Sequence, residues 1–332
     1  MKLFYRYSLP KCCLIVLISI SVLFLANTTS KAQSFATTNS SPGANEPYAI
    51  SVTSELVILP VNVTDKSGNF VSGLTEDSFQ VYDEKQLTTL ALFQQENAPV
   101  SVGLVVDHSS SMEQKLPEVI TAIRAFAHSA NPKDEMFIEA FNDSASIEPL
   151  DRKAFTDNSK ELENAVDAVS AHGRTALYDA IAEGLTHLQL SHFKRKALVI
   201  ISDGGDNASH FKRSEILELA RQSQVTIYSI ILESGSTGEQ NPKALRQLSD
   251  GTGGVAFSPE SAQSVVASSA QIARDLREQY VLGFVPEKHV SGNPFHKLRV
   301  NVTTPGNLKL HVRTRVGYSP GSAALTRINE NL

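Results

Sequence analysis

Polar side chains that could bind a cation follow two apolar runs of this chain. In LVVDHSSSM (residues 104–112) the apolar run ends at Asp107, and the hydroxyls of Ser109 and Ser111 come next. A second apolar run, in ALVIISDGGDN, ends at Asp203. A buried carboxylate is costly unless a positive group pairs with it. Neither stretch contains lysine or arginine, which makes a metal ion the candidate partner.

The positions of these residues strengthen this interpretation. Both aspartates follow runs that are typical of parallel strands, and ligands of open parallel sheets bind beyond the carboxyl ends of the strands. Two carboxylates at one edge repel each other unless a cation lies between them. Thr175, in GRTALYDAI, lies in a loop that leads into a helix and adds a hydroxyl. We therefore predict a metal site formed by Asp107, Ser109, Ser111, Thr175 and Asp203.

The type of oxygen donor favours particular ions. A small site rich in hydroxyls suits Mg²⁺ or Mn²⁺ better than Ca²⁺, which takes more oxygens in looser cages. Asp206 is expected to support the loop after Asp203. Asp179 falls in the first turn of its helix, where a negative charge suits the dipole, and is expected to hold the Thr175 loop. Helix capping alone would explain one such Ser or Asp residue, but not the whole set.

The elements that position these residues alternate between strand and helix. Strands are predicted at residues 102–106, 135–141, 196–202, 225–232 and 253–257, and helices at about 116–127, 159–170, 176–190, 213–222, 242–250 and 261–278. The helix at 242–250 is expected to stop at Gly251. This alternation predicts an α/β fold with a Rossmann-like, doubly wound, mainly parallel sheet that is covered on both faces.

Shorter alternating stretches flank the α/β unit. Residues 48–97 alternate apolar and polar side chains around a turn signal at 66–69, and residues 281–318 return to strands. We expect these strands to pair in one small β (Ig-like) module, so that the α/β unit at 98–280 is inserted into it. Residues 33–47 read as a flexible leader and 319–332 as a tail.

The first residues have the layout of a secretory signal peptide. A basic start, an apolar core at 13–26 and the small-residue pattern before Ala32 predict a signal at 1–32 that is cleaved after Ala32. An uncleaved anchor is the alternative. No second long apolar run exists, so no transmembrane segment is expected in the mature chain. Cys12 and Cys13 are the two cysteines of the chain, so the exported protein must be held by its core or by a metal.

Charge is distributed unevenly along the chain. Without the four basic residues of the signal, 26 Lys and Arg stand against 35 Asp and Glu, which gives a net charge of −9. Residues 288–329 carry seven basic residues and no acid, and Lys309, His311, Arg313 and Arg315 alternate as if on one face of a strand. We favour docking of this face on the acidic domain of the same chain; the alternative is an anionic cell-envelope surface. Nucleic acid is not expected, because no aromatic residues are interleaved with the basic ones.

The three motifs together resemble a von Willebrand factor A (VWA) domain. Asp107-x-Ser109-x-Ser111, Thr175 in GRTALYDAI and the SDG at Asp203 come in the order of that family, over about residues 98–280. The resemblance implies a metal-ion-dependent adhesion site, in which the hydroxyls bind the ion directly and the carboxylates act largely through water. It implies a protein partner that presents an Asp or Glu carboxylate. The flanking β segments resemble those of a group of secreted bacterial proteins with such a domain.

The sequence bears on three classes of function. The leading hypothesis is an exported or periplasmic, cation-dependent protein-binding or adhesion module. The alternative is a structural scaffold of the cell envelope whose metal only stabilises the fold. Enzyme activity is not expected: the second aspartate of dehalogenase-like phosphatases is replaced by Ser109, and GxSxG, HExxH and GxxxxGK motifs are missing from the sequence.

Overall fold

The structure is a computed structural model of the chain. It describes residues 56–95, 98–147, 154–167, 170–233, 240–286, 295–304 and 309–319. The predicted signal peptide, the leader at 33–47 and the tail beyond Ser319 lie outside the described residues.

A six-stranded sheet forms the centre of the α/β unit. Its order is β10-β9-β8-β5-β6-β7, and every pairing is parallel except that of β7 with β6. The strands are β5 (Ser101–Asp107), β6 (Glu135–Phe141), β7 (Ala145–Ile147), β8 (Lys196–Ser202), β9 (Thr226–Ile231) and β10 (Ala256–Phe257). All residues of β5 and β9 are buried, as expected for apolar runs covered on both faces. The predicted fold class is confirmed.

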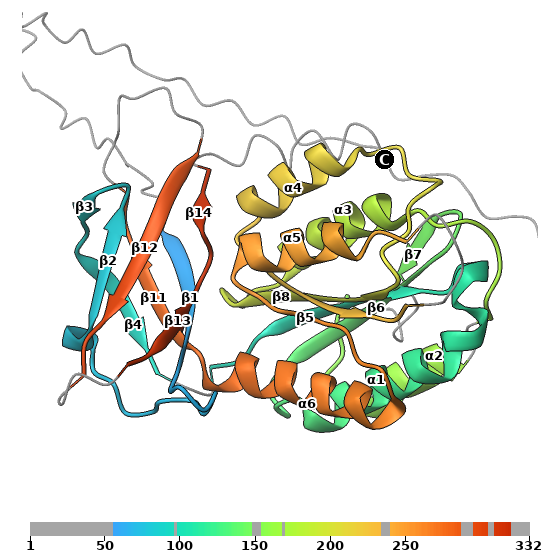
Figure 1. Cartoon of the computed structure of the whole chain (residues 1–332), viewed down its shortest axis with the longest axis horizontal. Helices are drawn as coiled ribbons and strands as arrows, with labels where there is room; N and C mark the ends of the chain where they lie inside the picture. The colour runs from blue at the N-terminus through green and yellow to red at the C-terminus, as the bar shows by residue number, and fades with distance from the viewer. Residues whose placement is uncertain are drawn as a thin grey trace, which may run out of the picture. The chain divides into compact units, whose positions relative to one another are not determined.

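Helices cover both faces of this sheet. They are α1 (Leu116–Ser129), α2 (Ser159–Asp167), α3 (Leu177–His187), α4 (Arg213–Gln222), α5 (Pro242–Thr252) and α6 (Ala262–Glu278). Helices α1, α2 and α6 lie on one face of the sheet, and α3, α4 and α5 on the other (Figure 1). None of the helices within the described ranges is long and apolar enough to cross a membrane.

The predicted ends of α3 and α5 differ from the structure. Helix α3 ends at His187, and a 3-10 turn at Leu188–Leu190 replaces its predicted last turn. The predicted stop at Gly251 is wrong, because α5 continues to Thr252. Gly253 is the C-cap, with a φ of 86° that a side chain would strain. A glycine ends this helix as expected, but it is Gly253 rather than Gly251.

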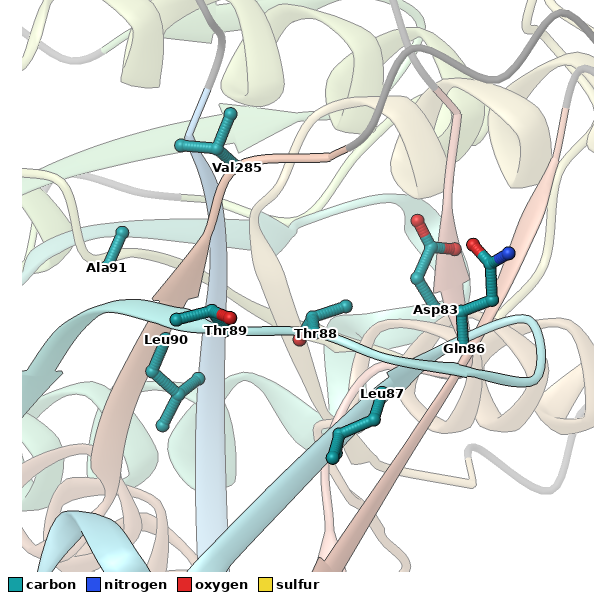
Figure 2. A pocket seen from close by; sticks show the side chains of 8 residues that line it. All are labelled: Asp83, Gln86, Leu87, Thr88, Thr89, Leu90, Ala91 and Val285. Carbon is teal, nitrogen blue, oxygen red and sulfur yellow. The ribbon is translucent and has the colours of Figure 1, made fainter.

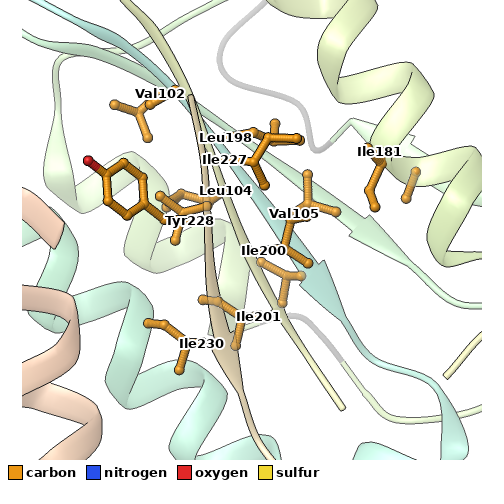
Figure 3. Close-up of a cluster of buried hydrophobic side chains, with 14 of the residues drawn as sticks. Val102, Leu104, Val105, Ile181, Leu198, Ile200, Ile201, Ile227, Tyr228 and Ile230 are labelled. Atoms are coloured by element: carbon orange, nitrogen blue, oxygen red, sulfur yellow. The ribbon is translucent and has the colours of Figure 1, made fainter. Parts of the chain in front are cut away.

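Aliphatic side chains from the central strands pack into one core with the helices. Val102, Leu104, Leu198, Ile200 and Ile227 have 0% exposure. Figure 3 shows these residues stacked along the strands, with Ile181 of α3 facing them from the helix layer. This core fixes the strand ends that carry the polar residues described below.

The strands before and after the α/β unit form two antiparallel sheets, ordered β13-β1-β11-β4 and β14-β12-β2-β3. The strands are β1 (Val57–Thr64), β2 (Phe79–Asp83), β3 (Gln86–Leu87), β4 (Leu90–Gln94), β11 (Tyr280–Phe284), β12 (His296–Val302), β13 (His311–Arg313) and β14 (Gly317–Tyr318). N-terminal β1 pairs with β11 and β13, and β2 pairs with β12. The expected β module of N- and C-terminal strands is therefore present. We call it the β module below.

The basic C-terminal segment differs from its predicted single strand. Strands β13 and β14 belong to different sheets, so the four alternating cations do not share one face. Lys309 and His311 are exposed, whereas Arg313 is half-buried and Arg315 is buried. Arg313 pairs with Asp275 of α6, and Arg315 donates to the carbonyl oxygen of Arg221. Arg313 and Arg315 therefore dock on the α/β unit of the same chain, as the favoured prediction had it.

Candidate metal centre

Asp107 and Asp203 lie at the point where the order of the sheet reverses. From β5 the chain continues to β6 on one side of the sheet, while β8, β9 and β10 occupy the other side. Asp107 is the last residue of β5, and Asp203 directly follows the neighbouring strand β8. Their exposed fractions are 0% and 2%. The structure thus buries two carboxylates at the edge of the sheet where ligands of this fold class bind.

Both oxygens of Asp107 accept hydrogen bonds. The backbone N–H of Ser109 donates to Oδ1 over 3.0 Å, and the hydroxyl of Ser202 donates to Oδ2 over 2.6 Å. Burial raises the pKa of Asp107 to about 6, and the charge of Asp203 adds to this rise, while the bonds from Ser202 and Ser109 oppose it. Burial therefore makes the ionised form of Asp107 unfavourable, and a bound cation would stabilise that ionised form.

The two serines after Asp107 lie together. Ser109 is 1% exposed, and its Oγ is 3.2 Å from the Oγ of Ser111. They sit at the start of a 3-10 turn (Ser110–Lys115) that leads into α1. Ser110, between them, is exposed, and its N–H donates to the carbonyl oxygen of Gly173 over 3.1 Å. This bond ties the serine loop to the loop that carries Thr175.

The Thr175 loop is bound to the loop that follows Asp203. Thr175 is 5% exposed, its N–H donates to Oδ1 of Asn207 over 2.9 Å, and its carbonyl oxygen accepts from the N–H groups of Asn207 and Ala208. Gly204 has a φ of 82°, and a Cβ there would come within 2.7 Å of the Asn241 carbonyl oxygen. Glycine therefore allows this close turn directly after Asp203.

Asp206 and Asp179 brace these loops. Oδ1 of Asp206 accepts from the N–H of Tyr178 in the first turn of α3 over 3.3 Å and from the hydroxyl of Ser209. Burial raises the pKa of Asp206 above its usual value. Asp179 accepts from the N–H groups of His210 and Phe211, each over 2.9 Å. Asp206 thus contacts the helix that follows Thr175. The expectation that Asp179 holds the Thr175 loop is wrong, because its carboxylate binds the segment at 210–211 instead.

Two histidines lie beside these residues in the chain, His108 directly after Asp107 and His172 three residues before Thr175. Nδ1 of His108 and Nδ1 of His172 lie 3.0 and 2.9 Å from the carbonyl oxygen of Ser170, and their rings meet edge to face at 5.4 Å. Nearby, Arg174 pairs with Asp143 over 3.1 Å. Its charge is thus paired with a carboxylate other than Asp107 or Asp203.

Sequence reasoning missed two residues of this site. Ser202 donates to Asp107, and Asn207 positions Thr175. Both lie in the ISDGGDN stretch, but their partners are 95 and 32 residues away in sequence, so only the fold reveals the contacts.

The donor set fits a hard divalent cation. Within the described part of the chain, no group of three or more His, Cys, Asp or Glu side chains could hold a metal ion, which gives no support to a site of the zinc type. The predicted set instead combines two buried carboxylates with three hydroxyls. Oxygen donors of this kind are what Mg²⁺ and Mn²⁺ prefer.

The comparison with protein families agrees with this fold. The model of the von Willebrand factor type A domain matches residues 101–271, which are 171 of the 332 residues. The chain belongs to this family. The matched VWA domain contains all five residues of the candidate metal site. The search of curated proteins gave no match.

Solved structures with a similar arrangement share little sequence with this VWA protein. A von Willebrand factor type A protein from Catenulispora acidiphila is 13% identical, with 84% of this chain and 78% of that chain covered and a TM-score of 0.48. An aerotolerance-related membrane protein from Bacteroides fragilis is 15% identical, with 53% and 98% covered and a TM-score of 0.44. The vWF domain of the type V pili tip protein Mfa5 from Porphyromonas gingivalis is 12% identical, with 55% and 95% covered and a TM-score of 0.41.

Proposed function

We propose that this VWA protein is an exported, divalent-cation-dependent protein-binding module without catalytic activity. Ser109, Ser111 and Thr175 would hold Mg²⁺ or Mn²⁺ through their hydroxyls, together with Asp107 and Asp203, and a carboxylate of a partner protein would complete the coordination. The observation that carries the proposal is the burial of Asp107 and Asp203, 0% and 2% exposed, at adjacent strand ends beside the Ser109–Ser111 pair.

The chemistry of the donors supports an anionic partner. Hydroxyls are neutral, so they leave most of the charge of a divalent ion uncompensated. Asp107 already accepts hydrogen bonds at both oxygens, from Ser109 and Ser202, which favours binding through water over direct coordination. When bound, the ion would supply a positive charge that attracts an Asp or Glu side chain of a partner.

The loops around the site supply rigidity. Thr175 is fixed at both its N–H and its carbonyl oxygen by residues 207–208, and Asp206 and Asp179 fasten the segments on either side. A site held by such bonds loses little entropy when a ligand binds. Export through the predicted signal peptide would bring the site to the cell envelope or the medium.

Calorimetric titration of metal-stripped residues 33–332 with Mg²⁺ and Mn²⁺ tests the metal site. We expect one saturable ion, and a loss of affinity of about tenfold or more for Ser109→Ala. Ser110→Ala is the matched control, because Ser110 is exposed between the two serines and contributes only its backbone N–H to the loop. Equal affinities for Ser109→Ala and Ser110→Ala would contradict the assigned ligands.

A second titration tests the partner group. Acetate should bind the Mn²⁺-loaded protein and be displaced by EDTA, whereas acetamide of similar shape should not bind. Metal binding that stabilises the fold without any preference for acetate would favour the scaffold alternative.

A further inference from the structure

A cavity of about 400 Å³ opens between the loop before β8 and the loop before β9. Its walls include Leu56, Ile58, Phe193, Lys194, Lys196 and Gln224. Lys196 is the first residue of β8, whereas Asp203 follows the last residue of that strand. The cavity therefore lies at the opposite end of the strand from the candidate metal site.

The charged side chains of this cavity are all basic. Among the described residues that line it are two lysines and a histidine (Lys194, Lys196 and His192) but no acid. The whole chain has more acids than bases, 35 against 30, so this local excess of positive charge departs from its average composition. Within the described ranges, neither lysine forms an ion pair with a carboxylate.

Lys196 is half-buried, and burial lowers its pKa, while the charge of Glu135 opposes this effect only in part. Glu135 is itself engaged, because its Oε1 accepts a hydrogen bond from the hydroxyl of Ser101 over 2.7 Å. The ammonium group of Lys196 has thus lost part of its hydration without gaining a bonded carboxylate. An anion in the cavity would stabilise its charged form.

Gln224 adds an amide donor to the cavity wall. Its backbone has a φ of 58°, in the left-handed region that residues other than glycine rarely occupy. Its Oε1 accepts from the N–H of Ile58 over 3.2 Å. The Nε2 group of the same amide has no partner among the described residues and is available to donate to a ligand. Strained positions of this kind persist where their surroundings hold them, and they cluster at functional sites.

The remaining wall of the cavity is apolar. Ile58 is 7% exposed, and Leu56 and Phe193 are half-buried. These side chains come from the start of β1 and from the loop before β8. A ligand that suits the whole cavity therefore has an anionic head and an aliphatic part.

The cavity at the β3–β4 connection shows the contrast. Figure 2 shows Asp83 at one side of this space, which has a volume of about 290 Å³. Nδ1 of His296 lies 3.1 Å from Oδ1 of Asp83, and the hydroxyl of Tyr318 donates to Oδ2 over 2.7 Å. That carboxylate is 2% exposed and already bound, so it has no need of a ligand.

We propose that the cavity before β8 binds a phosphate ester, with the phosphate at Lys194, Lys196 and the amide of Gln224 and the aliphatic part on Leu56, Ile58 and Phe193. A phosphate monoester carries up to two charges and three acceptor oxygens, so it can serve two ammonium groups and an amide at once. A carboxylate has one charge and two oxygens. Lysine binds phosphate as a point charge.

Two sources share this chemistry, a soluble organic phosphate and the head group of an anionic phospholipid. The proposal is independent of the metal site, because its residues lie at the other end of the sheet. EDTA is present in every experiment below, so that no divalent ion at the metal site binds phosphate.

Calorimetry of residues 33–332 with hexyl phosphate, inorganic phosphate and hexanol tests the chemistry of the ligand. We expect one hexyl phosphate per chain, bound about tenfold or more tightly than inorganic phosphate, since burial of about two methylene groups supplies this factor. Hexanol should show no saturable binding, because it lacks the charge.

Variants assign the binding to the cavity. Lys194→Gln and Lys196→Gln should each weaken hexyl phosphate binding about tenfold, whereas Lys160→Gln, an exposed lysine of α2, removes the same charge elsewhere and should have no effect. Phe193→Ala should weaken hexyl phosphate but leave inorganic phosphate unchanged. If Lys196→Gln lowers the unfolding midpoint, Lys194→Gln carries the test, because this side chain is exposed.

Vesicles distinguish the two sources. Cosedimentation with phosphatidylcholine vesicles that contain phosphatidylglycerol, competed by hexyl phosphate and lost in Lys194→Gln, would identify a lipid head group. Binding of hexyl phosphate without cosedimentation would identify a soluble phosphate.

Two results would overturn the proposal. One is the absence of saturable binding of hexyl phosphate to the wild type. The other is hexyl phosphate binding that Lys194→Gln and Lys196→Gln weaken no more than Lys160→Gln does, which would place the anion outside this cavity.

Discussion

Replacing Arg313 with alanine should destabilise the fold, although this residue lies in the short strand β13 of the β module. Its guanidinium pairs with Asp275 of α6 and donates to the carbonyl oxygen of Gly253 over 3.0 Å. It also lies 5.9 Å from the ring centre of Tyr228 in β9. One side chain therefore contacts the C-terminal ends of α5 and α6 and the sheet of the α/β unit.

The exposed fractions of Arg313 and Asp275 determine how much stability Arg313→Ala is expected to lose. Breaking a fully buried ion pair costs about 3–5 kcal/mol, because one charge is left without compensation. The side chain of Asp275 is 11% exposed but that of Arg313 is 30% exposed, so solvent screens part of the interaction. Asp275 also retains a hydrogen bond from Nε2 of Gln271 over 2.8 Å. We therefore expect a loss of about 2–3 kcal/mol in the free energy of unfolding.

Urea unfolding followed by circular dichroism measures this loss. The control is His311→Ala, two residues earlier on the same strand, whose exposed side chain should change stability by no more than about 0.5 kcal/mol. A double-mutant cycle with Asp275→Ala isolates the pair and should give a coupling of about 1–2 kcal/mol. Equal effects of Arg313→Ala and His311→Ala, or additive effects in the cycle, would refute the role of this contact.

Two further predictions concern the α/β unit. Glu139 is completely buried in β6, neither carboxyl oxygen has a partner among the described residues, and burial raises its pKa well above the usual 4.5. The folded state thus keeps a proton that the unfolded chain loses as pH rises through about 4.5, so the stability of the wild type falls with rising pH. The glutamine of Glu139→Gln does not ionise. The urea midpoint of this variant should therefore rise relative to that of the wild type from pH 4 to pH 7. A Cβ at Gly254 would lie 1.9 Å from the Ile227 carbonyl oxygen, so Gly254→Ala should lower the thermal midpoint by several degrees, whereas Gly251→Ala, with open space around its Cβ, should raise it slightly. An unchanged midpoint for Gly254→Ala, or the same pH profile for Glu139→Gln and the wild type, would contradict these arguments.

Local sequence patterns predicted the architecture well where burial on both faces dictates the residue types. The runs at Leu104–Asp107 and Ala197–Ser202 contain enough aliphatic residues that only interior parallel strands could accommodate them. The carboxylates at their ends then had to lie at one edge of the sheet. This rule places Asp107 and Asp203 at one edge of the sheet, but only the structure shows that β5 and β8 are neighbours.

Contacts between distant segments were beyond the reach of the sequence. Arg313 and Arg315 were predicted on one basic face of a single strand, but the chain leaves β13 after Arg313 and enters another sheet at Gly317. Burial of Arg315 against the end of α4 depends on this change of sheet, for which the alternation of residues gave no signal. Glu139 likewise looked like an ordinary position of a strand, because nothing local shows that α3 covers it.

The most direct test of the central claim counts the ions that the protein binds. Mn²⁺ is titrated into metal-stripped residues 33–332 and into Asp107→Ala, and the unbound ion is measured by electron paramagnetic resonance. We expect one tightly bound Mn²⁺ per wild-type chain, displaced by Mg²⁺, and none in Asp107→Ala at the same concentrations. Wild-type protein that binds no Mn²⁺, or a variant that binds it as well as the wild type, would contradict the assignment of a metal site at the ends of β5 and β8.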